Sequence, residues 1–155
     1  MQALDRESYS VQDIKKQALS YLSRREYGIT ELRIKLLNKF DSRLQIDQTL
    51  EVLQNEDLLN ENRYVQSYIQ SRVNKGYGPE RIRMELMQKG IAMTLVDKAF
   101  FKCGVDWHAE IQKVWSKKYR SAVSKDLEEI ARQWRFLQYR GFPTDMIKRV
   151  LKKVV

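Results

Sequence analysis

The sequence predicts an all-α protein made of three tandem repeats, each of three helices. The first observation is an internal repeat, because Tyr27–Leu37 (YGITELRIKLL) returns as Tyr77–Met87 (YGPERIRMELM), 50 residues later. A third, partial copy relates Gln88–Lys98 to Tyr139–Arg149 at a shift of 51 residues. The second observation is that prolines occur only at positions 79 and 143, and that no stretch alternates with the period of a strand. Repeats of this length are typical of stacked helical units, so we expect an elongated molecule.

Repeat 1 is assigned to residues 1–60. Ile14, Ala18 and Leu22 recur every four residues and mark one face of its first helix. Gly28 offers a cap, so the second helix is expected to open directly after it. The apolar stripe of the third helix consists of Ile46, Leu50 and Leu53.

Repeat 2 is assigned to residues 61–104. Its first two helices are separated by Lys75–Gly78, a turn whose two glycines adopt positive φ at little cost. Pro79 then suits the first position of a helix, where its missing N–H costs nothing. Gly90 is expected to end that helix, and Thr94 is expected to cap the third one.

Repeat 3 is assigned to residues 105–155, with Gly141 ending its second helix and Thr144 opening its last. Aromatic residues lie among lysines and arginines here, a pattern that can stack single-stranded bases. At helical spacing, however, Trp115 and Trp134 are expected in the core. Tyr77, in the glycine-flanked turn of repeat 2, is either an exposed contact or a plug between repeats, and the sequence favours neither.

The second helices of repeats 1 and 2 are apolar on two sectors of the helical wheel. At about 100° per residue, Ile82 and Leu86 fall on one sector, and Met84 and Met87 on another. Repeat 1 copies this pattern with Leu32 and Leu36 on the first sector and with Ile34 and Leu37 on the second. We therefore expect such a helix to contact its own repeat on one side and the neighbouring repeat on the other.

Two arginines of the second helix in repeat 2 are predicted to play different roles. Arg81 falls on the far side of the wheel from both apolar sectors, which makes it the better candidate for a ligand contact. Arg83 falls between the sectors and is expected to bridge to a nearby carboxylate while its stem packs.

The net charge is +9, and most of it lies at the C-terminal end. Residues 101–155 hold 13 Lys and Arg against six Asp and Glu, whereas residues 1–100 hold 16 against 14. Such a field suits contact with nucleic acid or with an acidic protein surface. The alternative is a solvated basic surface that only keeps the protein in solution.

Several classes of function are disfavoured by what the chain lacks. Cys103 and His108 are each alone, so no internal disulfide, metal site or nucleophile–base pair is expected. The chain has no phosphate-binding loop and no Gly-x-Ser-x-Gly motif, so we expect neither an enzyme nor a cofactor. No apolar run approaches the ~20 residues that cross a bilayer, and the N-terminus has no signal-peptide core. We therefore expect a cytoplasmic protein without a membrane partner.

Four segments resemble the RecX family, regulators of the bacterial recombinase RecA. They are Ser71–Leu86, which carries the specific run Lys-Gly-Tyr-Gly-Pro followed by Arg-Ile-Arg, together with Tyr27–Leu36, Asp57–Tyr64 and Arg135–Phe142. The resemblance covers about residues 14–151. One departure is Asp-Leu-Leu at positions 57–59, where family members often carry Gly-Tyr-Leu, which suggests a slightly different turn.

The resemblance implies tandem three-helix repeats in an elongated, curved arrangement. It also implies binding to the RecA–DNA filament in its helical groove, with suppression of ATP hydrolysis, strand exchange and co-protease activity. RecA regulation of this kind bears on homologous recombination, DNA repair and the SOS response. We expect a monomer whose partners are the RecA filament and single- or double-stranded DNA. The alternative is a direct DNA-binding helical protein that competes with RecA for DNA.

The candidate contacts with a partner or with nucleic acid are basic residues of repeats 2 and 3 and one tyrosine. Lys148 and Lys152 share one face of the last helix, and Arg149 and Lys153 share the adjacent one. The full set is Arg72, Lys75, Tyr77, Arg81, Lys113, Lys117, Lys118, Arg132, Arg135, Arg140, Lys148, Arg149, Lys152 and Lys153.

Overall fold

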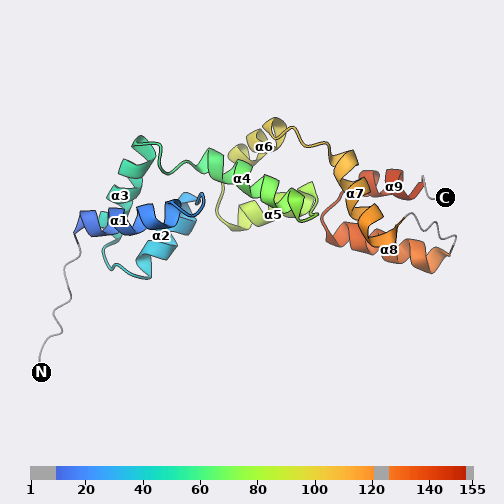
Figure 1. The fold of residues 1–155 in the computed structure, drawn as a ribbon, viewed down its shortest axis with the longest axis horizontal. Coiled ribbons are helices and arrows are strands. Elements are labelled where there is room, and N and C mark those ends of the chain that lie inside the picture. The colour runs from blue at the N-terminus through green and yellow to red at the C-terminus, as the bar shows by residue number, and fades with distance from the viewer. Residues whose placement is uncertain (1–9, 121–125, 153–155) are drawn as a thin grey trace, which may run out of the picture. The chain divides into compact units, whose positions relative to one another are not determined.

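The computed structural model describes residues 10–120 and 126–152, and within them it contains nine helices and no strand (Figure 1). The all-α prediction, with three helices in each of three groups, is confirmed. The helices are α1 (Val11–Leu22), α2 (Ile29–Leu37), α3 (Arg43–Asn55), α4 (Glu61–Asn74), α5 (Pro79–Gln88), α6 (Met93–Lys102), α7 (Trp107–Tyr119), α8 (Leu127–Tyr139) and α9 (Thr144–Lys152).

The chain divides into two compact units, and the division falls between Tyr64 and Val65, inside α4. The first unit contains α1, α2, α3 and the first turn of α4. The second contains the rest of α4 and the helices from α5 to α9. Repeat 2 from Val65 onward therefore lies in one unit with repeat 3, and the contacts between them position the site described below.

In the first unit, α3 packs against both α1 and α2. Ser10 begins α1 with a capping box, since its side chain accepts from the Asp13 backbone while the Asp13 carboxylate accepts from the Ser10 backbone. Ser42 caps α3 in the simpler way, by accepting from the Gln45 backbone N–H. The core between the helices is apolar and fully buried, and it includes Ile14, Ala18, Leu32, Leu36, Ile46, Leu50 and Leu53.

The turn after α3 contains the departure from the family pattern. Asp57 has a φ of 58°, the left-handed conformation that glycine adopts without penalty. Its carboxylate accepts a hydrogen bond from the Asn60 amide, 2.9 Å away, and pairs with Arg63 at 3.0 Å. Arg63 also pairs with Glu26 at 2.9 Å, so these contacts tie the start of α4 to repeat 1.

In repeat 2, α5 begins as predicted, with Gly78 at the N-cap and Pro79 in the first turn. Ile82 and Leu86 are fully buried. The expectation that Thr94 caps α6 is wrong. The helix begins at Met93, so Thr94 already lies inside it. Ala92 occupies the N-cap position and makes no side-chain hydrogen bond there.

The second apolar sector of α2 and α5 is not covered. Met84 is 53% exposed and Met87 is 43% exposed, and the equivalent Ile34 and Leu37 are 57% and 38% exposed. The expectation that this sector contacts a neighbouring repeat is therefore wrong for α5. Within the second unit, α5 meets repeat 3 through the backbone of its first turn and the Arg81 side chain, which leaves the methionine sector facing solvent.

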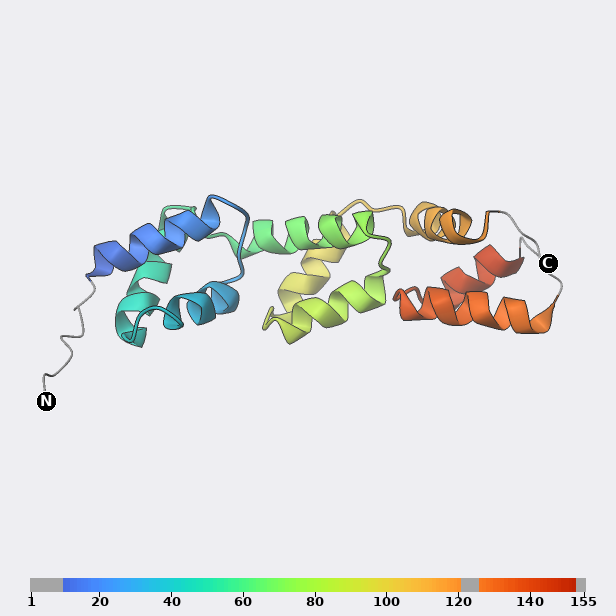
Figure 2. The ribbon, with the colours of Figure 1, turned by 60° about the horizontal axis from the view of Figure 1, so that its bottom comes forward.

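Repeat 3 closes around a core of its own, in which α9 packs against α7 and α8 (Figure 2). Trp115 is buried as predicted, and its indole N–H donates to the Gln133 side-chain oxygen at 2.9 Å. Gln133 is itself 1% exposed, so this is a hydrogen bond between two buried side chains. Trp134 is partly buried against the same core.

Candidate functional site

Repeats 2 and 3 meet backbone to backbone. The Gly78 N–H donates to the Arg140 carbonyl at 2.7 Å, and the Glu80 N–H donates to the Gly141 carbonyl at 3.0 Å. A Cβ on Gly78 would lie 2.5 Å from the Gly141 carbonyl carbon, and a Cβ on Gly141 would lie 2.3 Å from the Arg81 Cβ. No other residue type fits at that separation, so both glycines are needed to bring the start of α5 against the end of α8 (Figure 2).

Three arginines surround the ring of Tyr77 at this junction. The guanidinium carbons of Arg72, Arg81 and Arg140 lie 4.1, 4.3 and 5.0 Å from the centre of the ring. Arg81 also lies 4.9 Å from the ring of Tyr139. The structure thus places the Tyr77 ring inside the junction between repeats, the second of the two roles that the sequence allowed. Cation–π contacts of this kind are each worth about 0.5–2 kcal/mol.

Two of these arginines share one carboxylate. Glu85 accepts from Arg72 at 2.7 Å, from Arg81 at 3.2 Å and from the Tyr68 hydroxyl at 2.5 Å. Burial acts to raise the pKa of Glu85, but the hydrogen bonds from Arg72, Tyr68 and Arg81 outweigh it, so the pKa is lowered. The Glu85 side chain is only 16% exposed, which is consistent with a structural pair.

Arg81 lies opposite the apolar sectors of α5, as the helical wheel predicts, but it is not an open side chain. Its side chain is 24% exposed, and besides Glu85 it donates to the Tyr139 carbonyl at 3.2 Å. The helical wheel placed Arg81 opposite the apolar sectors of α5, but that side of the first turn is where the end of α8 packs. The expectation for Arg83 is confirmed, because its guanidinium pairs with the Asp97 carboxylate on α6.

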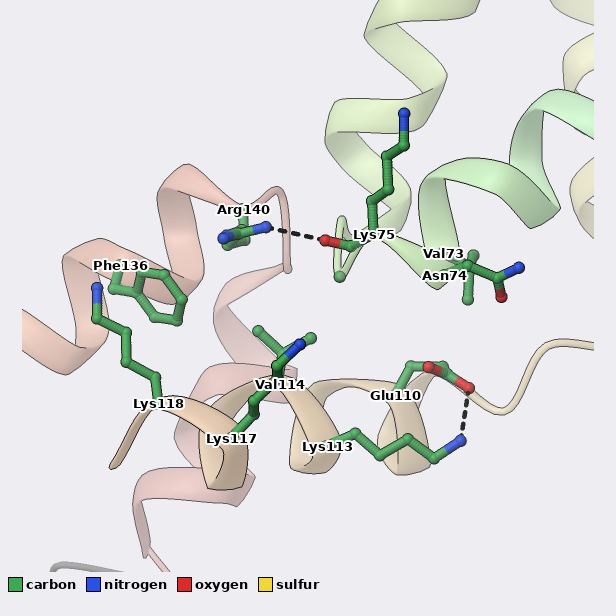
Figure 3. Close-up of a pocket in the computed structure, with 11 residues that line it drawn as sticks. Val73, Asn74, Lys75, Glu110, Lys113, Val114, Lys117, Lys118, Phe136 and Arg140 are labelled. Carbon is green, nitrogen blue, oxygen red and sulfur yellow. Dashed lines mark hydrogen bonds and ion pairs between the residues drawn. The ribbon is translucent and has the colours of Figure 1, made fainter. Parts of the chain in front are cut away.

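Beside the junction, a cleft of about 590 Å³ opens between the end of α4, the helix α7 and the end of α8 (Figure 3). We call it the basic cleft, because five cations and one carboxylate line it, with an apolar floor. The cations are Lys75, Lys113, Lys117, Lys118 and Arg140; the carboxylate is Glu110; the remaining lining residues are Val73, Asn74, Gly76, Val114 and Phe136.

The cations of the basic cleft differ in how they are engaged. Lys113 pairs with Glu110 at 3.2 Å, and Arg140 donates to the Lys75 carbonyl at 3.0 Å. The Lys118 ammonium lies 3.9 Å from the centre of the Phe136 ring. Within the described residues, the ammonium groups of Lys75 and Lys117 make no hydrogen bond or ion pair. Figure 3 shows Lys117 rising from α7 into the cleft, whereas the Lys75 side chain runs away from α7.

The structure separates the candidate residues into three groups. Five line the basic cleft, whereas Arg72, Tyr77 and Arg81 build the junction beside it. Arg149 and Lys152 line a smaller pocket of about 340 Å³ with His108, whose Nε2 lies 3.1 Å from the Arg149 Nη1. The others do not join a site: Arg132 pairs with Glu129 at 3.4 Å, Arg135 and Lys148 are exposed, and Lys153 lies outside the described residues.

Sequence reasoning missed the apolar floor of the cleft. Neither Val114 nor Phe136 stands out in the sequence as a lining residue, and Gly76 is predicted there only as part of the turn. The one local signal was the spacing of Lys113 and Lys117, which lie four residues apart and so share a face of α7. Among the described residues, no group of three or more His, Cys, Asp or Glu could hold a metal ion.

Comparison with known proteins identifies the family. Residues 60–99 match the family model described as "RecX, second three-helix domain", and residues 106–151 match "RecX, third three-helix domain". The chain belongs to the RecX family. "Regulatory protein RecX" of Pseudomonas savastanoi pv. phaseolicola is 42% identical over 138 residues, which cover 89% of each chain, and that of Pseudomonas syringae pv. tomato is 44% identical over the same length and shares.

A solved RecX structure confirms the fold. The crystal structure of RecX from Lactobacillus salivarius matches with a TM-score of 0.74 at 22% identity, covering 93% of this chain and 96% of that one. These relatives are named as regulatory proteins, and the chain belongs to their family. None of the helices in the described part of the chain has the length and apolar character needed to span a bilayer.

Proposed function

We propose that the protein regulates RecA by binding the RecA–DNA filament in its helical groove, where it suppresses ATP hydrolysis, strand exchange and co-protease activity. Membership of the RecX family supports the regulatory role. The observation that carries the proposal of a nucleoprotein partner is the basic cleft, where five cations face one carboxylate. We expect the protein to act as a monomer in the cytoplasm.

The protein can inhibit RecA by binding alone, without any catalytic activity of its own. A bound protein shifts a conformational equilibrium only by the difference in its affinity for the two states. A regulator that binds the filament more tightly in a state that does not hydrolyse ATP therefore lowers the rate of hydrolysis as it saturates the filament. Positive charge raises the rate of encounter with an anionic filament, and salt weakens this effect.

Titration of the full chain into RecA assembled on a single strand tests the proposal. We expect ATP hydrolysis to fall in proportion to the amount of protein that sediments with the filament. A protein in molar excess that neither sediments with the filament nor slows hydrolysis would refute it.

The second candidate function is direct DNA binding in competition with RecA, and the same basic cleft favours it. The order of addition separates the two functions. Competition predicts strong inhibition when the protein meets DNA before RecA, and little when the filament already exists. Binding to the filament predicts inhibition in both orders.

A further inference from the structure

The size of the basic cleft limits what can enter it. A volume of about 590 Å³ is that of a small-ligand pocket. The cleft therefore accepts one nucleotide-sized group or a short stretch of one chain, and it does not accept a duplex. Its walls come from the turn after α4, from α7 and from the end of α8, which the backbone junction at Gly78 and Gly141 holds together.

The charges of the cleft suit phosphates. Lys117 points into the cleft and has no partner within the described residues (Figure 3). Lys113, one turn earlier on α7, is held by a single exposed ion pair with Glu110, and a ligand can displace that pair because exposed ion pairs contribute little to stability. Lysine ammonium groups are point charges that commonly bind phosphates in proteins.

An aromatic ring lies beside these charges. Phe136 is partly buried, its ring forms a T-shaped pair with that of Tyr119, and Lys118 and Arg140 lie 3.9 and 5.3 Å from its centre. A phosphate that draws Lys118 toward itself uncovers this ring for a base. Cations interleaved with aromatic rings are the combination by which proteins bind single strands, with phosphates on the charges and bases on the rings. An acidic peptide needs the charges but gains little from the ring.

We propose that the basic cleft binds one strand of nucleic acid directly, with phosphates on Lys113, Lys117 and Lys118 and a base against Phe136. This inference rests on the proposed function for its biological setting, because the strand would be the DNA of the filament. The contact itself needs no RecA, so it can be tested on the bare strand.

The test measures the anisotropy of a fluorescein-labelled oligo(dT) as the full chain is added, at several salt concentrations and without RecA. The cleft variant is Lys113→Glu/Lys117→Glu. The matched control is Lys98→Glu/Lys102→Glu, which reverses two exposed lysines four residues apart on α6, within the same unit. Both variants change the net charge equally, so only position differs.

We expect the cleft variant to bind the strand at least tenfold more weakly at ~0.1 M salt, and the control less than threefold. Each lost phosphate contact lowers the slope of log K against log salt by about 0.7 for a single strand. The cleft variant should therefore lose about 1.4 of that slope. Phe136→Leu should weaken binding without changing the slope, a result that loss of a base contact predicts and loss of charge does not.

Four results would overturn the proposal. They are no binding of the bare strand even at ~0.05 M salt, equal losses in the cleft variant and its control, tighter binding of a duplex than of the strand, and displacement of the strand by polyglutamate as readily as by unlabelled oligo(dT). Inhibition of RecA ATP hydrolysis is measured with the same proteins. If the cleft proposal fails while the wild type still inhibits RecA, the proposed function stands; if strand binding holds but inhibition is absent, only the proposed function fails.

Discussion

Replacement of Gly141 by alanine should loosen the junction between repeats 2 and 3. Gly141 has a φ of +98°, and an added Cβ would lie 2.3 Å from the Arg81 Cβ and 2.7 Å from the Arg81 nitrogen. Neither neighbour is the mobile end of a side chain, so the backbones must separate.

The magnitude follows from two contributions. The backbone conformation costs an alanine about 1–2 kcal/mol. Separation also weakens the hydrogen bonds from Gly78 to Arg140 and from Glu80 to Gly141, each worth about 0.5–1.5 kcal/mol. We therefore expect Gly141→Ala to lower the free energy of unfolding by roughly 2–5 kcal/mol. Gly104→Ala is the control, because Gly104 has a φ of +64° but no atom within 4 Å of a built Cβ, so only the conformational part applies.

Urea unfolding measures the difference. All three tryptophans, at positions 107, 115 and 134, lie in repeat 3, so their fluorescence follows that repeat while circular dichroism follows every helix. We expect Gly141→Ala to lose about 1–3 kcal/mol more than Gly104→Ala. Equal midpoints and slopes for the two variants would show that the close backbone contact adds nothing to stability.

Four further substitutions test the packing and the charges. Ile82→Ala should cost about 2–5 kcal/mol, because the side chain is fully buried, whereas Met84→Ala should stay within about 0.5 kcal/mol; thermal unfolding compares them. Gln133→Leu leaves the buried indole of Trp115 without an acceptor and should cost about 1–3 kcal/mol in urea; an unchanged midpoint would contradict this. Glu85 has a lowered pKa in the folded state, so its contribution is present above the unfolded value of about 4.5 and is lost as the pH falls through the folded value. Glu85→Gln should therefore flatten the acid side of the stability profile, and a profile unchanged below that pH would refute the role of the carboxylate.

The helices could be predicted from the sequence because their signals are local. Gly28 and Pro79 mark helix starts by backbone geometry alone, and the buried Ile82 and Leu86 follow from a four-residue spacing. The prediction was wrong at Thr94. Threonine is a common capping residue, but here the helix has already begun at Met93, so Thr94 lies within its first turn.

The candidate site could be predicted only in part. Lys113 and Lys117 share a helix face, and their spacing reveals it. Arg140 reaches the carbonyl of Lys75 across 65 residues of sequence, and no local pattern encodes that approach. Arg81 reaches the Tyr139 carbonyl across a similar sequence distance, and a helical wheel could not show this because it describes one helix and not the neighbour that covers it.

The junction at Gly78 and Gly141 also affects how the protein can diversify. Its hydrogen bonds join main-chain atoms, so they do not depend on the chemical identity of the side chains that project around them. Substitutions at exposed lining positions such as Lys113 and Lys117 can therefore change the preferred ligand of the cleft while its walls keep their spacing. The two glycines have no such freedom, because any side chain there pushes the walls apart. Geometry and specificity are thus controlled by separate residues, and a designer could retune one without disturbing the other.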